Sequence, residues 1–148
     1  MSKKDAKVAA LLADIDPQGW SLEYAGFFAC FNQGLYYEAH DVLESLWLKD
    51  RLGTDGDFYK GLIQLAGAFV HLQKQRLSPA VALFKLATKN LSKYPPTHHG
   101  LRGCELLALI DHWRSALESN PHHNPLIDLP APHIDIGNRH ALAAIGIG

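Results

Sequence analysis

Residues 57–76, DFYKGLIQLAGAFVHLQKQR, carry the pattern that decides the fold. Large apolar side chains recur there every three or four residues, which places them along one face of a helix. They are Phe58, Leu62, Leu65, Phe69 and Leu72. Glycine and alanine occupy positions 61 and 66–68 between them, so a neighbouring helix can approach closely. The stretch predicts a central helix that is capped by Asp55 or Asp57 and runs to about Arg76.

The same periodicity predicts helices on both sides of the central one, over about residues 8–15, 20–31, 36–48, 79–94 and 100–118. The segment after residue 120 is different, because it holds four of the eight prolines and only a short alternation at 133–136. We therefore expect an all-α fold, a compact bundle of five or six helices over residues 1–120. An extended C-terminal tail over residues 121–148 would pack on the bundle or on a partner subunit.

The length and composition are those of one globular domain, with 148 residues of which 47% are apolar and 20% charged. The formal net charge is −1, and lysine and arginine do not cluster, which argues against a nucleic-acid partner. No apolar run approaches the ~18 residues of a membrane helix, and none resembles a signal peptide. The two cysteines, Cys30 and Cys104, lack a CxxC spacing. We expect a cytoplasmic protein without a membrane partner.

Polar residues interrupt the apolar pattern of two predicted helices. His40, Glu44 and Trp47 are spaced i, i+4 and i+7, so they project from one face of the helix over 36–48. Gln64 and His71 are two turns apart on the central helix. Buried polar groups without partners cost on the order of 1–3 kcal/mol each. These residues therefore mark the candidate site.

Three interpretations of His40 and Glu44 remain open. They are an exposed helix pair that contributes a few tenths of a kcal/mol, a buried pair that fixes helix register, or two ligands of one divalent metal ion. His71 is the candidate third metal ligand, or else a lone histidine near a helix end. Gln64 and Asn32 would orient the imidazole rings by hydrogen bonding.

The remaining histidines and the common catalytic motifs give weaker signals. Adjacent histidines occur as His98-His99 and His122-His123. Successive side chains of a regular element point apart, so we expect neither pair to bind one ion. The sequence has no HExxH zinc motif, no glycine-rich phosphate or dinucleotide loop and no GxSxG nucleophile motif.

Two stretches resemble the bacterial and archaeal domain-of-unknown-function family numbered 309. They are residues 31–47, FNQGLYYEAHDVLESLW, and residues 58–68, FYKGLIQLAGA. The resemblance extends over about residues 20–94 and implies a compact helical bundle. It also implies a His-x-x-x-Glu-x-x-Trp element suggested to bind metal, matched here by His40, Glu44 and Trp47. The family has no established activity, so the reaction stays unnamed.

Two functions follow from these observations. In the first, a divalent metal ion or an unidentified small molecule binds between the third and fourth predicted helices. His40, Glu44 and His71 would be the metal ligands, with Trp47 as the apolar wall, and Glu44 would act as general base in a hydrolase-like reaction. In the second, the helical hairpins bind a peptide or a second subunit in a homo-oligomer. A structural network of His40, Glu44 and Gln64 would then set the packing.

Overall fold

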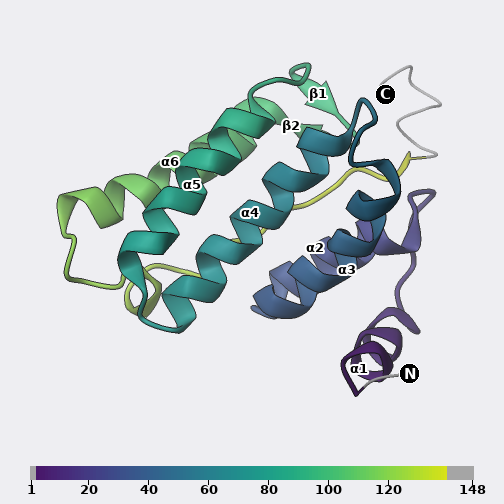
Figure 1. Ribbon diagram of the computed structural model, residues 1–148, viewed down its shortest axis with the longest axis horizontal. Helices are drawn as coiled ribbons and strands as arrows, with labels where there is room; N and C mark the ends of the chain where they lie inside the picture. Colours follow the sequence, from purple (N-terminus) through teal and green to yellow (C-terminus); the bar gives the residue numbers. More distant parts are fainter. Residues whose placement is uncertain (1–2, 140–148) are drawn as a thin grey trace.

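The computed structural model describes residues 3–139, and over this range the chain forms six α-helices (Figure 1). They are α1 (Lys3–Leu12), α2 (Leu22–Asn32), α3 (Tyr36–Asp50), α4 (Gly56–Gln73), α5 (Leu77–Leu91) and α6 (Gly103–Ser119). Two short strands, β1 (Thr97–His98) and β2 (Leu101–Arg102), and one 3₁₀-helix, η1 (Pro125–Ile127), complete the described elements. The predicted all-α class is confirmed. None of the helices within 3–139 is long and apolar enough to cross a membrane.

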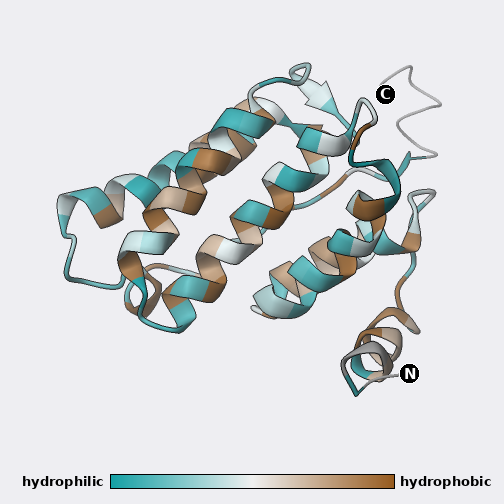
Figure 2. Ribbon diagram, in the orientation of Figure 1, coloured by the Kyte–Doolittle hydropathy of each residue, from teal (hydrophilic) through white to brown (hydrophobic). Residues whose placement is uncertain are grey.

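Consecutive helices pack against one another, with α4 between α3 and α5 and with α6 against α5 (Figure 1). Hydrophobic and hydrophilic residues alternate along α4 and α5 in Figure 2, as expected of helices that bury one face. Helix α4 has no side-chain cap at its N-terminus, so packing supplies most of its stabilisation.

The small residues of α4 allow the close approach that the sequence predicts. A Cβ atom at Gly61 would lie 2.7 Å from Leu91 Cγ and 2.9 Å from Leu91 Cδ2, both on α5. About two turns further along α4, the fully buried Phe69 ring contacts Phe84 and Trp113, with ring centroids 5.3 and 4.9 Å away. Burial of such a side chain contributes about 1.5–3 kcal/mol relative to exposure. The core therefore lies along the inner face of α4.

A β-hairpin between α5 and α6 was not expected. Thr97 pairs with Arg102 and His98 pairs with Leu101 in antiparallel register. The two turn residues, His99 and Gly100, have φ of +47° and +78°, and positive φ at both positions is the geometry of two-residue hairpin turns. The prediction of helix from residue 100 is therefore wrong at its start, because α6 begins only at Gly103.

The described part of the tail, residues 121–139, returns from the end of α6 to the hairpin end of the bundle (Figure 1). Asn124, which is buried, donates from Nδ2 to the carbonyl of Leu72 at 2.6 Å and accepts from Leu126 N at 3.0 Å. Ile134 is also buried. The division into a domain of 1–120 and a tail of 121–148 stays a prediction, and the apolar segment 141–147 lies outside the described residues.

Candidate metal centre

The Asp55 carboxylate joins the start of α4 to the hairpin. Its Oδ1 atom lies 2.8 Å from His98 Nε2, and its Oδ2 atom lies 2.8 Å from His99 Nε2. Asp55 occupies the N-cap position of α4, as the sequence predicts for Asp55 or Asp57, but its side chain makes no capping hydrogen bond. The Asp55 carboxylate, which at an N-cap would ordinarily accept a hydrogen bond from a backbone N–H of the first turn, therefore bonds two imidazoles instead.

The hairpin turn brings the two histidine rings together. Adjacent histidines of a regular element are expected to point apart, and for His98 and His99 this prediction is wrong. His99 leaves the strand with φ of +47°, which rotates its side chain back to the side of His98. The ring centroids are 4.1 Å apart and the ring planes are tilted by 44°. Two Nε2 atoms therefore face one carboxylate.

Aromatic rings from α4 and from the segment after α5 surround the two imidazoles. Phe58 and Tyr94 lie against His98, with centroids 4.7 and 4.9 Å away. Tyr59 stacks parallel to His99 at 6.3 Å. The side chains of Asp55, His98 and His99 keep 21%, 23% and 28% of their surface exposed. The aromatic wall thus orients the donors and leaves them accessible to a small ion.

The carboxylate of this cluster is ionised. Burial alone raises the pKa of Asp55, but the hydrogen bonds and charges of His99 and His98 outweigh burial and hold this pKa below its usual value. Because an ionised carboxylate only accepts hydrogen bonds, each Nε2 atom carries the proton. Burial, together with the charges of Asp55 and Asp50, raises the pKa of Tyr59 to about 12. The Tyr59 phenol is therefore neutral at physiological pH.

The donor set fits a divalent metal ion. One ring nitrogen of each histidine and one carboxylate oxygen all lie within 4.8 Å of one another. Two imidazoles and one carboxylate are ligands of zinc and of non-haem iron in proteins. Among histidine, cysteine, aspartate and glutamate of residues 3–139, this is the one place where three such donors converge.

The predicted pair His40 and Glu44 lies on the surface of α3. His40 Nδ1 is 3.8 Å from Glu44 Oε2 and 3.2 Å from Asp41 Oδ1. The side chains of His40 and Glu44 are 32% and 44% exposed, so the interpretation as a buried pair is wrong. Trp47, two turns along the same helix, is half-buried. His71 does not converge on His40 and Glu44 within the described residues. Metal binding by this set stays a prediction.

The two amides predicted to orient the imidazoles have other partners. Asn32 Nδ2 donates to the carbonyl of Ile134, and Asn32 Oδ1 accepts from its backbone N–H, both at 2.8 Å. Gln64 Oε1 accepts from Asn90 Nδ2 of α5 at 2.8 Å. Asn32 therefore holds the tail, and Gln64 faces α5 instead of His40.

His71 is half-buried near the C-terminus of α4. Its Nδ1 atom is buried and has no hydrogen-bond partner among the described residues. Burial, followed by the charges of Arg76 and Lys74, lowers the pKa of His71. The surroundings of His71 thus favour the neutral ring.

The chain matches one family model, described as a domain of unknown function (DUF309), over residues 24–92. Residues 24–92 are a DUF309 domain. No curated protein and no solved structure matches the chain. The match confirms the resemblance in the sequence. Asp55 lies inside the DUF309 domain, whereas His98 and His99 follow it, so the cluster combines a residue of the DUF309 domain with two residues of the hairpin.

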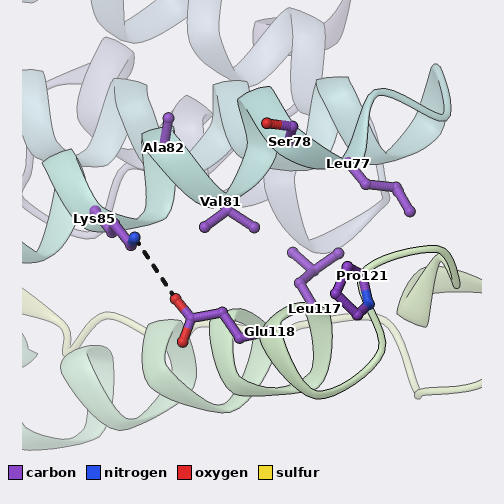
Figure 3. A pocket seen from close by; sticks show the side chains of 8 residues that line it. All are labelled: Leu77, Ser78, Val81, Ala82, Lys85, Leu117, Glu118 and Pro121. Atoms are coloured by element: carbon purple, nitrogen blue, oxygen red, sulfur yellow. Dashed lines mark ion pairs between the residues drawn. The ribbon is translucent and has the colours of Figure 1, made fainter.

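A groove of about 470 Å³ lies elsewhere, between α5 and α6. Its lining residues are Leu77, Ser78, Val81, Ala82, Lys85, Leu117, Glu118 and Pro121. Figure 3 shows Val81 and Leu77 pointing toward Leu117 and Pro121, with an ion pair between Lys85 and Glu118 at 3.8 Å on one side. The groove lining contains no histidine or cysteine, so its chemistry suits an apolar segment better than a metal ion.

Proposed function

We propose that this protein binds one divalent transition-metal ion through Asp55, His98 and His99. The observation that carries the proposal is the convergence of both Nε2 atoms on one carboxylate at 2.8 Å. Three protein ligands leave at least one coordination position for water or a small molecule, which distinguishes catalytic sites from closed structural ones. An ion held there would act as a Lewis acid toward that molecule. A hydrolase-like reaction is compatible with this donor set.

Metal binding at this site should depend on pH. In the metal-free cluster each Nε2 atom carries a proton that it donates to the carboxylate. An ion binds the Nε2 lone pair, so the proton there must move to Nδ1 of a neutral ring or be lost from a protonated ring. Protonation of either imidazole therefore opposes binding, and affinity should rise with pH. The carboxylate is already ionised, because the pKa of Asp55 is lowered.

The test uses the untagged full chain, freed of metal by chelation and titrated with zinc, manganese or nickel ions. Three single variants remove one ligand each: Asp55→Asn, His98→Gln and His99→Asn, in which asparagine tolerates the positive φ. His40→Gln removes a ligand of the site predicted on α3. His112→Gln, on the exposed face of α6, is the matched histidine control.

We expect one bound ion per chain and a thermal midpoint that rises with metal. At a free-metal concentration of about 100 times Kd the stabilisation is about 2.7 kcal/mol. Each of the three cluster variants should lose this rise, whereas His112→Gln and His40→Gln should keep it. An unchanged rise in His98→Gln and His99→Asn would refute the proposal. Loss of the rise in His40→Gln alone would move the site to α3.

Self-association is the second candidate function, and the groove between α5 and α6 favours it. Apart from the Lys85–Glu118 pair, the side chains that face one another across the groove are apolar, and this surface suits a second copy of the chain. Val81→Glu would place a charge in the groove. If the groove is an interface, light scattering should show an oligomer for the wild type and a monomer for Val81→Glu. A monomeric wild type at high concentration would exclude this function.

A further inference from the structure

The segment of residues 134–139, here called the C-terminal strap, runs alongside α2 toward the hairpin (Figure 1). Its first residue is held firmly. Ile134 is buried, and Asn32 at the end of α2 bonds both its backbone N–H and its carbonyl at 2.8 Å. Both polar atoms of the Asn32 side chain are engaged by Ile134, whereas His98 and His99 bond Asp55. The strap is thus anchored at a point outside the candidate site.

The other end of the strap bonds groups beside the site. Trp20 Nε1 donates to the carbonyl of Gly137 at 2.6 Å, and Gly137 N donates to the carbonyl of Gly100 at 3.2 Å. Arg139 N donates to the carbonyl of Gln18 at 2.8 Å, and the Arg139 guanidinium lies 5.2 Å from the Trp20 ring. The strap therefore contacts both the hairpin turn and Trp20.

The same two groups hold His99 in place. Gly100 is the second turn residue, and its Cα is packed so closely that a Cβ atom there would lie 2.9 Å from Trp20 Cζ2 and 3.2 Å from Gly137 N. The Trp20 ring meets the His99 ring edge-on at 6.0 Å. Tyr24 completes the contact by donating its hydroxyl to the His99 carbonyl at 2.7 Å. Movement of the strap would release Trp20 and Gly100, and with them the His99 ring.

We infer that the C-terminal strap is a positioning element of the metal centre, which sets the direction of His99 Nε2 through Trp20 and Gly100. This inference rests on the proposed metal site. An ion that binds His99 selects the conformation in which the strap is docked. By linkage, the docked strap must strengthen metal binding by the same factor by which the metal strengthens docking.

The test removes the distant anchor of the strap. Asn32→Ala deletes both hydrogen bonds to Ile134 without touching a ligand. Gln73→Ala is the matched control, because it deletes one side-chain bond to a backbone carbonyl, that of Gly34, at 3.0 Å. We expect the Kd for zinc, measured by chelator competition, to rise about 5- to 150-fold in Asn32→Ala, the usual range of coupling between sites. The Kd of Gln73→Ala should stay at the wild-type value.

Asn32→Asp gives a second variant, which keeps an acceptor for the Ile134 N–H but turns a carboxylate oxygen toward the Ile134 carbonyl, where it repels instead of donating. Its Kd for zinc should also rise above the wild-type value, which covers the case that Asn32→Ala does not fold. Hydrogen exchange adds a second measurement, which would not respond to zinc if the strap only stabilised the fold. Saturating zinc should slow exchange of the Gly137 amide in the wild type.

The outcomes separate the inference from the metal site itself. If the wild type binds no zinc, the proposed function fails. If the wild type binds zinc but Asn32→Ala and Asn32→Asp have the wild-type Kd, only the inference fails. Exchange of the Gly137 amide at the same rate with and without bound zinc would also overturn the inference.

Discussion

Replacement of Gly100 by alanine tests whether the hairpin turn is as crowded as the structure shows. Gly100 has φ of +78°, a conformation that costs an alanine about 1–2 kcal/mol. The added methyl group would also lie 2.9 Å from Trp20 Cζ2, which belongs to a rigid ring. Overpacking of this kind costs about 1–3 kcal/mol. We therefore expect Gly100→Ala to lose about 2–5 kcal/mol of unfolding free energy, the sum of the two terms.

Gly34 provides the matched control. Its φ is +77°, almost that of Gly100, but a Cβ atom at Gly34 would meet nothing within 4 Å. Gly34→Ala should therefore lose only the backbone term, about 1–2 kcal/mol. Urea unfolding at 25 °C measures both losses, provided that the slope m is unchanged.

The difference between the two variants is the decisive quantity. A loss for Gly100→Ala no larger than that for Gly34→Ala would refute the close contact among Gly100, Trp20 and Gly137. The metal response gives a second comparison, because Gly100 adjoins the ligand His99. Zinc should raise the thermal midpoint of Gly34→Ala as in the wild type and raise that of Gly100→Ala less.

Three further predictions concern groups outside the metal centre. Burial raises the pKa of Cys30 to about 11, so a thiol-alkylating reagent at pH 8 should modify the exposed Cys104 in the folded protein and spare Cys30, as mass spectrometry would show. The folded-state pKa of His71 is lowered, so the unfolded chain binds the proton first and the free energy of unfolding should fall as pH falls below about 6.5. In urea unfolding, His71→Asn should lose less stability than the wild type over this pH range, and an equal loss in both proteins would contradict the prediction. The hydrogen bond from Lys7, at 2.5 Å, lowers the pKa of Glu38. This contact therefore stabilises the fold above the pKa of Glu38 in the unfolded chain, and the stabilisation is lost as pH falls through its pKa in the folded protein. Lys7→Met should lower the free energy of unfolding by up to about 1 kcal/mol at pH 7 and leave it unchanged at pH 2.

The helices could be predicted because each is encoded by its own residues. Helix α4 needs only the spacing of Phe58, Leu62, Leu65 and their successors, and the glycine that admits Leu91 is visible in the same stretch. The hairpin could not be predicted by the same means, because strands of two residues are too short to show an alternation. Its one local signal is His99-Gly100, a pair in which only glycine adopts positive φ freely.

The Asp55–His98–His99 site could not be predicted because Asp55 is distant in sequence from the two histidines. His40 and Glu44 share a helix face, so their proximity follows from helix geometry, and they do lie 3.8 Å apart. Asp55 is more than forty residues from His98 and His99. Each of the three also has an adequate local explanation: Asp55 as a helix cap, and the histidines as a polar turn. Periodicity cannot reveal which carboxylate a turn will face.

Two local preferences are overridden at the cluster, and this supports a function for it. A capping hydrogen bond from Asp55 to the start of α4 is worth about 1 kcal/mol, and the structure forgoes it. His99 adopts positive φ, at a cost of about 1–3 kcal/mol for a residue other than glycine. Both departures serve one result, the convergence of three ligand atoms in a wall of aromatic rings. Such costs persist in folded proteins mainly where a site requires them. In the double variant Asp55→Ser with His99→Gly, serine can cap α4 and glycine adopts the positive φ without strain. This variant should therefore lose metal binding while its unfolding free energy without metal stays close to that of the wild type.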